Sequence, residues 1–414
     1  MDKRIIIIGG GAAGMMAAIS AADAGAEVVI VERNDRCGRK LRITGKGRCN
    51  LTNDCTPNEL MQNVPTNPKF LYAALSHFES SDTMALFESA GVPLKVERGR
   101  RVFPVSDKAI DVVDAMVKMC RDRGVKIIKG RVSEILSENG KASGVSIGGE
   151  RMSAGAVIVA TGGKSYPLTG SDGDGYRLAG ELGHTTVTPK PSLVPLTSRD
   201  KDCPYMQGLS LKNVALKMVD KTNGKTVFED FGEMMFTHFG LTGPMILSAS
   251  AHLPDVESGK YEARIDLKPA LDEKTLDARL LSDFAKFNNK DFINSLEALL
   301  PQKMIEIVVR RSKIDPRKKV NSITKEERRA LLEVIKSFSV SISGFRPIEE
   351  AIVTKGGIST KEINPKTMES KLCSGLYFAG EVIDVDAYTG GYNLQIAFST
   401  GALAGTYAAY SVSE

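Results

Sequence analysis

The first 32 residues constrain the fold of this chain more than any other segment. An apolar run at residues 5–8 leads into three glycines and an alanine-rich stretch at 13–24, and a second apolar run ends in Glu32. Short apolar runs bounded by glycine are typical of buried strands, and the alanine-rich stretch between them favours a helix. Strand, glycine turn, helix, strand and acid in this order predict the first half of a dinucleotide-binding α/β fold.

Each glycine of this fingerprint has its own physical reason. Gly9 permits the tight turn off the first strand, Gly11 lets a pyrophosphate approach the backbone, and Gly14 lets the helix pack closely on the sheet. The helix begins at Ala12 and Ala13, where free N–H groups and the positive end of the helix dipole attract an anion. Glu32 is placed to accept hydrogen bonds from a ribose hydroxyl and disfavours a 2′-phosphate there.

Composition indicates an ordinary soluble globular protein of two to three domains, with 414 residues, 42% hydrophobic and 25% charged. No segment approaches the ~18 uninterrupted apolar residues of a membrane span, and the apolar N-terminal run is too short for a signal peptide. The six cysteines form no CxxC pair and have no zinc spacing, so we expect reduced thiols, no metal site and a cytoplasmic location. Cys49 and Cys55 leave a redox-active pair as an alternative, although five residues separate them.

The formal net charge of +5 conceals two basic segments. Residues 33–48 hold seven basic side chains against one acid, and residues 301–330 hold ten against four, so the rest of the chain is mildly acidic. This asymmetry indicates anionic partners at two places. For 301–330 the alternative is a pair of solvated helices without a ligand.

The sequence pattern changes twice along the chain. Prolines punctuate short alternating stretches after Pro189, a charged helical stretch follows Leu271, and the buried strand 376–381 then leads to a helix of small residues at 394–410. We therefore predict that the first domain returns after an insertion. The expected boundaries are 1–188 for the first part of the nucleotide domain, 189–268 with about 339–355 for an inserted β domain, 269–338 for an inserted helical subdomain, and 356–414 for the return.

The C-terminal return narrows the identity of the nucleotide. Gly380 and Glu381 close a strand, and Gly390 and Gly391 precede a second helix that starts at Tyr392-Asn393. A helix N-terminus of this kind can face the N1/C2=O edge of a flavin and stabilise its reduced, anionic ring. The Glu381 carboxylate is placed to bind a ribityl hydroxyl.

Several motifs together give a family resemblance. They are the N-terminal fingerprint, Gly38-Arg39-Lys40, the loop from Gly45 to Asn53 (GKGRCNLTN), Ala160-Thr161-Gly162-Gly163, the stretch from Phe236 to Pro244 (FTHFGLTGP), and the C-terminal stretches 380–386 (GEVIDVD) and 390–395 (GGYNLQ). In combination they closely resemble the BaiN-like (aminoacetone-oxidase-like) FAD flavoproteins over nearly the whole chain.

The resemblance implies an α/β fold, namely a glutathione-reductase-like FAD-binding Rossmann domain interrupted by an inserted β-barrel-like and helical domain. It implies that the Gly45–Asn50 loop lies near the pyrophosphate or the flavin, and that Val132 meets the adenine through its backbone. The residues expected at the cofactor are Gly9, Gly11, Ala12, Ala13, Gly14, Glu32, Arg33, Lys40, Gly45, Gly47, Arg48, Val132, Thr161, Gly162, Gly380, Glu381, Gly391, Asn393 and Leu394.

Two parts of this set have simpler alternatives. Arg39, Arg42 and Arg48 also suit a solvated loop, and Thr161-Gly162 also suits a plain turn at the end of a strand.

A second strand-linked GxGxxG is missing from the sequence, because the glycine-rich stretch 170–175 follows Pro167 rather than a strand. We therefore expect NAD(P)H to dock transiently at FAD rather than on a domain of its own. The favoured reaction is hydride delivery to a conjugated C=C, since members of similar families are linked to reduction of steroid enones and of uridine in ribosomal RNA. The alternatives are an FAD-dependent amine oxidase that uses O2, and a non-enzymatic RNA-binding protein that retains FAD.

Three side chains are candidates for the proton donor of such a reduction. His238 titrates in the right range, although a histidine between two phenylalanines also suits simple packing. Cys49 lies among cations that are expected to lower the pKa of its thiol. Tyr392 either lines the pocket or packs.

Overall fold

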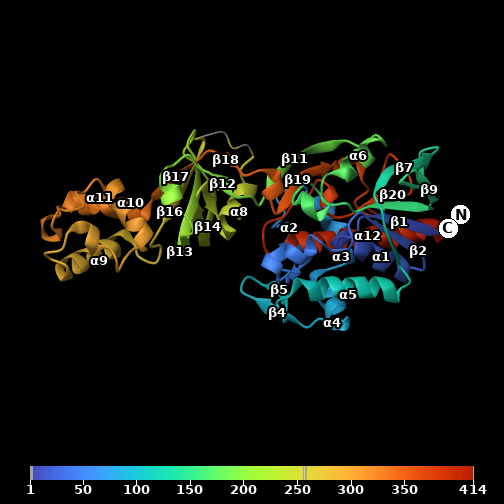
Figure 1. Ribbon diagram of the computed structural model, residues 1–414, viewed down its shortest axis with the longest axis horizontal. Coiled ribbons are helices and arrows are strands. Elements are labelled where there is room, and N and C mark those ends of the chain that lie inside the picture. The colour runs from blue at the N-terminus through green and yellow to red at the C-terminus, as the bar shows by residue number, and fades with distance from the viewer. Residues whose placement is uncertain (1–2, 255, 257–258, 414) are drawn as a thin grey trace. The chain divides into compact units, whose positions relative to one another are not determined.

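The computed structural model describes residues 3–254, 256 and 259–413, and the chain divides into two compact units (Figure 1). Unit 1 consists of Met1–Ser192 and Ile348–Glu414, and unit 2 consists of Leu193–Pro347. Each unit has its own apolar core: the buried apolar side chains of one cluster all belong to unit 1, and those of the other all belong to unit 2. The nucleotide domain is therefore divided in sequence, with unit 2 inserted between its two parts.

Unit 1 is built around a five-stranded parallel sheet. Its strands are, in spatial order, β20 (Leu376–Phe378), β10 (Ala156–Val159), β1 (Arg4–Ile8), β2 (Glu27–Glu32) and β6 (Lys126–Lys129). The continuous apolar runs predicted as buried strands pair with one another: Ile5 lies opposite Val28 on one side and Ala156 on the other. The strand order places β20, from the C-terminal return, in the same sheet as the N-terminal fingerprint.

Helix α12 (Tyr392–Ser413) packs along α1 (Ala12–Asp23) at very short range. A Cβ atom at Gly401 would lie 2.4 Å from the Ala13 carbonyl oxygen, and one at Gly405 would lie 2.2 Å from the Ala17 carbonyl oxygen. Glycines four residues apart on α12 thus face alanines four residues apart on α1. This contact between small residues joins the two ends of the chain.

Smaller elements complete unit 1. The further strands are β3 (Thr52–Asn53), β4 (Leu94–Glu97), β5 (Arg101–Pro104), β7 (Val132–Glu138), β8 (Lys141–Ile147), β9 (Glu150–Ser153), β11 (Thr186–Ser192) and β19 (Val353–Ile358). The further α-helices are α2 (Pro57–Met61), α3 (Tyr72–His77), α4 (Ser80–Ser89), α5 (Ala109–Asp122) and α6 (Asp174–Gly180). The 3₁₀ turns are η1 (Leu41–Gly47), η2 (Pro68–Leu71), η3 (Pro167–Thr169), η6 (Ile348–Glu350), η7 (Thr360–Glu362) and η8 (Gly380–Val382).

Unit 2 contains a seven-stranded antiparallel sheet that closes on itself. Its order is β17 (Phe338–Ile342), β16 (Tyr261–Asp266), β13 (Ser210–Asp220), β14 (Thr226–Thr237), β15 (Gly240–Thr242), β12 (Leu196–Thr197) and β18 (Gly344–Phe345). The two edge strands β17 and β18 follow each other in sequence, and the Ser343 amide between them donates to the Thr197 carbonyl at 2.8 Å. One continuous stretch therefore pairs with both edges, which gives the barrel-like form predicted for the insertion.

The remaining part of unit 2 is helical. It comprises α9 (Glu273–Lys286), η4 (Phe292–Ser295), α10 (Gln302–Ser312), η5 (Val320–Ser322) and α11 (Lys325–Lys336), while α7 (Asp202–Tyr205) and α8 (Pro244–Ala251) accompany the strands. In Figure 1 α9, α10 and α11 lie together beside β16 and β17. Thr324 caps α11 in a reciprocal capping box with Glu327.

The two units divide the chain at 192/193 and 347/348, whereas the sequence places the changes of domain at 188/189 and 355/356. The difference arises because β11 and β19 pair with each other, with Ser192 opposite Val353. Both ends of the insertion thus leave unit 1 beside one two-stranded sheet. Among the described residues, none of the helices has the length and apolar character needed to span a bilayer.

Candidate active site

The N-terminus of α1 forms an open cradle for an anion. A Cβ atom at Gly11 would have no described protein atom within 4 Å beyond its chain neighbours and its own helix, whereas one at Gly14 would lie 1.9 Å from the Gly9 carbonyl oxygen. The helix has no side-chain cap and no acid in its first turn, so its first N–H groups and its positive dipole end are available. Gly11 therefore leaves space for a ligand, while Gly14 is needed for packing.

Glu32, at the end of β2, lies next to this cradle. Its carboxylate accepts hydrogen bonds from the Gly10 N–H at 2.8 Å and from the backbone and side-chain N–H groups of Asn34, both at 2.8 Å. The Gly130 N–H donates to the Glu32 carbonyl at 2.9 Å, which brings the start of β7 and the buried Val132 to the same strand end. The predicted ribose and adenine residues thus lie side by side.

Arg33 turns away from the cradle toward two acids. Its guanidinium contacts Asp172 directly and lies 3.8 Å from Asp174, at the start of α6. Asp174 also pairs with Arg131 at 2.6 Å. These pairs connect the glycine-rich stretch 170–175 to the end of β2, and they occupy the Arg33 side chain with protein partners.

Lys40 and Glu381 meet across 341 positions of the sequence. Lys40 Nζ lies 2.7 Å from Glu381 Oε2 and 2.6 Å from Ser165 Oγ, and Ser165 donates to Glu381 Oε1 at 2.9 Å. The Thr354 N–H donates to the same oxygen at 2.7 Å. Both carboxylate oxygens of Glu381 therefore have protein partners. The Lys40–Glu381 pair fixes the end of β20 relative to the basic segment 33–48.

The end of the basic segment 33–48 and the adjoining Cys49 adopt a strained turn. Gly45, Lys46, Gly47 and Cys49 all have φ between 56° and 83°. The Arg48 guanidinium lies over the Phe103 ring, 4.2 Å from its centroid, and pairs with Glu97 and Asp107. Arg48 therefore binds two acids of unit 1. This placement matches neither the predicted contact with the cofactor nor an arginine that is merely solvated in a loop.

The prediction that neighbouring cations lower the pKa of the Cys49 thiol is wrong. The thiol is fully buried, and burial raises its pKa to about 12. The cations that adjoin Cys49 in sequence point elsewhere, as Arg48 shows, so they do not stabilise a thiolate. The six cysteines are all unpaired, and the redox pair of Cys49 with Cys55 is not formed.

The N-terminus of α12 lies against the end of the loop Gly45–Asn53. A Cβ atom at Gly391 would lie 2.3 Å from the Thr52 carbonyl oxygen, and the side-chain amide of Asn53 donates to the Gly390 carbonyl at 3.1 Å. Asn393 accepts from the Ala387 N–H at 2.9 Å and donates to its carbonyl at 2.7 Å, so it holds the preceding turn. The first turn of α12, which includes Leu394, contains no acid.

Three buried polar atoms near the strand ends have no hydrogen-bond partner among the described residues. They are Thr161 Oγ1, Asn53 Oδ1 and Asp386 Oδ1. Buried polar atoms are normally paired, so unpaired ones at a strand end indicate a missing group. Gly162 has φ +74° and Gly380 has φ +76°, and a Cβ atom at Gly380 would lie only 2.7 Å from the Ala13 Cβ, which is too close.

Of the three predicted proton donors, Tyr392 and Cys49 belong to unit 1 and His238 belongs to unit 2. Tyr392 is half-buried at the start of α12, and burial raises the pKa of its phenol. Cys49 is enclosed in the same unit. His238 is exposed in unit 2, in the turn between β14 and β15, with its ring centroid 5.0 Å from that of Phe239.

A pair of acids that the sequence analysis gave no role lies between Glu381 and α12. Asp386 is completely buried, and its Oδ2 accepts from Ser192 Oγ at 2.7 Å. Asp384 is half-buried, with Asn67 donating to its Oδ2 at 3.0 Å. Both acids lie in the C-terminal stretch 380–386 that contributes to the family resemblance. The signal in the sequence was therefore two acids, two residues apart, in the loop that follows a buried strand.

The family model described as the HI0933-like protein Rossmann domain matches residues 3–407. The chain belongs to this HI0933-like family. Its members are FAD-binding Rossmann proteins of the BaiN-like (aminoacetone-oxidase-like) type, which confirms the resemblance and makes the chain an FAD-dependent oxidoreductase of that family.

Two relatives match the HI0933-like chain over nearly its full length. It is 33% identical to a 3-dehydro-bile acid delta(4,6)-reductase of Clostridium scindens, covering 98% of this chain and 99% of the relative. It is 32% identical to a ribosomal RNA dihydrouridine synthase of Escherichia coli, covering 95% of each. Among solved structures, the E. coli quinol fumarate reductase subunit FrdA covers 99% of this chain and 70% of its own, with a TM-score of 0.52 and 17% identity, which is a likeness of fold.

The residues of unit 1 fit FAD. The open cradle at Gly11 suits a pyrophosphate, Glu32 suits the adenosine ribose, and the acid-free N-terminus of α12 suits the pyrimidine edge of the flavin. When bound, FAD supplies two-electron hydride chemistry, and the protein supplies position and electrostatics.

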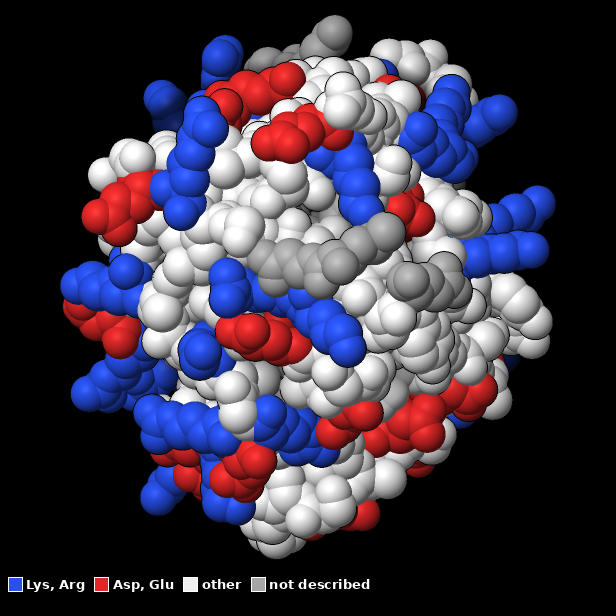
Figure 2. All heavy atoms as spheres, turned by 90° about the vertical axis from the view of Figure 1, so that its right-hand side faces the viewer, with Lys and Arg blue, Asp and Glu red and all other residues white. Residues whose placement is uncertain are grey.

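The basic segment 301–330 is largely paired with acids in unit 2. The pairs are Arg310 and Arg311 with Asp202, Arg311 with Asp200, Lys318 with Glu327, Lys319 with Asp291, Arg328 with Asp277, and Arg329 with Glu333. Four exposed cations, Lys303, Lys313, Arg317 and Lys325, have no acid within 4.0 Å in the part of the chain that the structure describes, and Lys303 donates to the Gln207 carbonyl at 2.8 Å. Figure 2 shows a face of unit 1 rather than this segment, and on that face basic and acidic side chains are interspersed.

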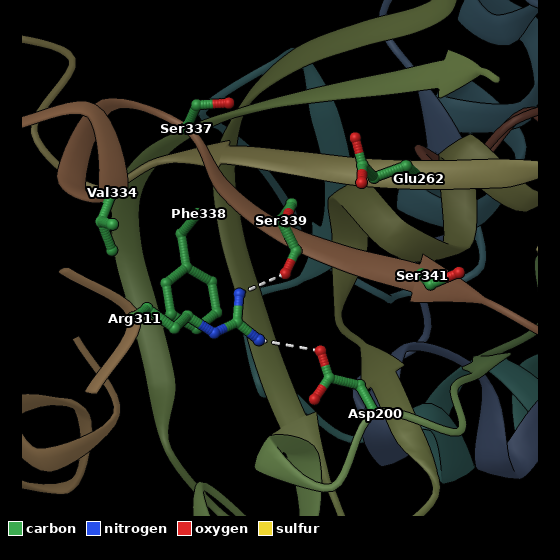
Figure 3. A pocket seen from close by; sticks show the side chains of 8 residues that line it. All are labelled: Asp200, Glu262, Arg311, Val334, Ser337, Phe338, Ser339 and Ser341. Carbon is green, nitrogen blue, oxygen red and sulfur yellow. Dashed lines mark hydrogen bonds and ion pairs between the residues drawn. The ribbon is translucent and has the colours of Figure 1, made fainter. Parts of the chain in front are cut away.

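Unit 2 also carries a hollow of about 460 Å³ (Figure 3). In it the Arg311 guanidinium stacks on Phe338, 4.1 Å from the ring centroid, and donates to the Ser339 carbonyl at 2.5 Å and to Asp200 at 2.8 Å. The remaining lining residues are Glu262, Val334, Ser337 and Ser341. Because Arg311 is held by protein partners, this hollow offers no free cation to a phosphate.

Proposed function

We propose that this HI0933-like protein is an FAD-dependent reductase that takes electrons from NAD(P)H and saturates a conjugated C=C bond. The observation that carries the proposal is the full-length similarity to two relatives whose names both describe C=C reduction, a bile acid delta(4,6)-reductase and a dihydrouridine synthase. The cradle at Gly11 and the helix end at Tyr392 would hold the two ends of FAD. NAD(P)H would dock transiently and leave before the substrate enters.

The substrate is either a small enone or a uridine base in ribosomal RNA. Pairing of six of the ten cations in 301–330 supports the small molecule, because Lys303, Lys313, Arg317 and Lys325 are the ones left in the described part of the chain to meet phosphates without an acid nearby. Four phosphate contacts would give a shallow salt dependence, with a slope of log K against log salt of about −3 for single strands.

The experiment uses the FAD-loaded protein reduced with dithionite under anaerobic conditions. It is mixed separately with a 3-dehydro-delta(4,6) bile acid, with ribosomal RNA that lacks dihydrouridine, and with buffer containing O2. Reoxidation of the flavin by either unsaturated substrate, well above its rate in anaerobic buffer, supports the reductase and selects the substrate class.

Reoxidation by O2 alone, together with reduction of the oxidised flavin by a small amine, would instead establish the amine oxidase. For the location of the protein we propose the cytoplasm, where its six unpaired thiols would stay reduced.

A further inference from the structure

The hairpin formed by β4 and β5 brings its tip to the start of α12. The side-chain amide of Asn53 donates to the carbonyl of Gly99, at the hairpin tip, at 2.9 Å, and to the carbonyl of Gly390, in the turn before α12, at 3.1 Å. Asn53 is buried, and it pairs with Arg101 of β5 in the small sheet. One fixed amide thus joins the hairpin tip to the helix end that is expected at the flavin.

Cations outnumber acids where this hairpin meets the loop Gly45–Asn53. The set, which we call the hairpin cluster, consists of the cations Lys46, Arg48, Lys95, Arg98 and Arg101 and of the two acids that lie within 4.0 Å of any of them in the described part of the chain, Glu97 and Asp107. The ring of Phe103 brings two of the cations together, because the guanidinium of Arg48 lies 4.2 Å from its centroid and that of Arg101 lies 5.7 Å from it.

Both acids of the hairpin cluster are ionised near neutral pH. Arg48 holds the pKa of Glu97 below its usual range, and Lys95 together with Arg48 does the same for the pKa of Asp107. Five cations against two carboxylates leave an excess of three positive charges. Such an excess attracts anions to this part of the surface.

Two cations of the hairpin cluster are free to meet a ligand. Lys46 and Arg98 are exposed, and their side chains have neither an acid within 4.0 Å nor a hydrogen-bond partner among the described residues. Arg100, at the same tip, is by contrast neutralised by Glu59 at 2.9 Å. Lys46 and Arg100 both have φ +59°, a left-handed conformation that non-glycine residues disfavour and that is often found at functional sites.

We propose that the hairpin cluster binds the phosphate groups of NAD(P)H while the nicotinamide ring reaches the helix end at Tyr392. This inference rests on the proposed function, which requires a dinucleotide donor although the sequence lacks a second strand-linked GxGxxG for it. Lys46 and Arg98 donate hydrogen bonds to phosphate oxygens, since ammonium and guanidinium groups are donors only. The remaining three cations add long-range attraction. Contacts on an exposed surface suit a donor that docks transiently and then leaves.

The first test measures binding without electron transfer. The FAD-loaded, full-length protein is titrated calorimetrically with NADP+, which cannot reduce the flavin. The double variant Lys46→Gln/Arg98→Gln is expected to bind NADP+ roughly 10–100-fold more weakly, as for the loss of one or two charge-assisted hydrogen bonds. It should keep the FAD content and melting temperature of the wild type, because both side chains are exposed and unpaired.

Arg151→Gln is the matched control. Arg151 is also exposed and has no acid within 4.0 Å among the described residues, but it lies in β9, which belongs to a different sheet from the β4–β5 hairpin. This variant should bind NADP+ as the wild type does. Added salt should weaken binding by the wild type more than binding by the double variant, since screening acts on the charges that the double variant lacks.

The second test follows anaerobic reduction of the flavin at increasing NADPH concentration. The double variant is expected to need a roughly 10–100-fold higher NADPH concentration for half the limiting rate, with the limiting rate itself unchanged. A purely structural role of the two side chains would lower the limiting rate or the FAD content instead. This measurement also decides the case in which NADP+ binds too weakly for calorimetry.

An unchanged NADPH requirement in the double variant would overturn the assignment of the hairpin cluster while leaving the proposed function intact. If that variant had instead lost affinity for ribosomal RNA, the cluster would be a nucleic-acid surface rather than a site for the donor. Failure of NADPH and NADH to reduce the flavin of the wild type at any concentration would overturn the proposed function, and this inference with it.

Discussion

At the scale of single residues, two residues of the same type have different roles because their surroundings differ. Gly11 and Gly14 belong to one fingerprint, but only Gly11 faces open space, whereas Gly14 meets the Gly9 carbonyl. Asp384 and Asp386 differ in the same way, one half-buried and the other enclosed.

Exchange of each glycine for alanine separates ligand space from packing. Gly11→Ala should fold with a free energy of unfolding close to that of the wild type, because its φ of −82° and ψ of −169° suit alanine, but it should retain less FAD. Gly14→Ala should lose at least about 1–3 kcal/mol of stability through overpacking. Flavin absorbance per protein and denaturant titration measure the two effects, and equal FAD loss with equal unfolding in both variants would contradict the assignment.

The stability of Asp384→Asn should depend on pH in a defined direction. The pKa of Asp384 is raised in the folded protein above its usual 3.8, so the folded state binds the proton more tightly than the unfolded state. As pH rises from about 4 through the raised pKa, the wild type loses stability that the uncharged variant keeps. Denaturant titrations at several pH values should therefore show the variant gaining on the wild type with increasing pH, and a constant difference would refute the buried charge.

At the scale of elements, the contact between α1 and α12 couples the cofactor site to the fold. Both helices present their N-termini to the predicted FAD, and Gly401 and Gly405 set their separation through the Ala13 and Ala17 carbonyls. A displacement of α12 would thus move both helix ends at which the two halves of FAD are expected to bind.

Gly401→Ala should lower the free energy of unfolding by about 1–3 kcal/mol and weaken FAD retention at the same time. Gly180→Ala, near the end of α6, is the matched control, because a Cβ atom there meets no described protein atom within 4 Å beyond its neighbours and its own helix. It should be neutral or stabilising by up to about 1 kcal/mol. Thermal melts with a flavin readout compare the variants, and an unaffected Gly401→Ala would show that the helices separate freely.

The elements predicted from sequence were those set by local spacing. The N-terminal strand and the helix expected at 13–24 appear as β1 (Arg4–Ile8) and α1 (Ala12–Asp23), within one residue of their expected bounds, because apolar periodicity and flanking glycines are local signals. The partners of side chains were not predictable in this way. Arg48 meets Glu97 and Asp107, and Asp384 meets Asn67, through contacts between distant segments that a single sequence does not reveal.

At the scale of the whole molecule, the chain contains two cores that share no buried apolar residue. The chain leaves unit 1 and returns to it at neighbouring points, since Ser192 lies opposite Val353 in the β11–β19 pair. The insertion could therefore be exchanged without stretching unit 1.

Replacement of residues 193–347 by a Gly/Ser linker of about five residues should yield a folded unit 1 that binds one FAD. Paired strands lie about 5 Å apart, so such a linker closes the gap between Ser192 and residue 348. Cooperative thermal unfolding and flavin stoichiometry are the measurements. A shortened chain that fails to fold, or that folds without FAD, would contradict the assignment of the complete FAD site to unit 1.

The most direct test of the proposed reductase is the visible spectrum of the purified, FAD-loaded protein mixed anaerobically with NADPH or NADH. The account predicts that a nicotinamide donor bleaches the oxidised-flavin absorbance rapidly. A flavin that stays oxidised with both nicotinamides and bleaches only with an amine would contradict the account and identify an oxidase.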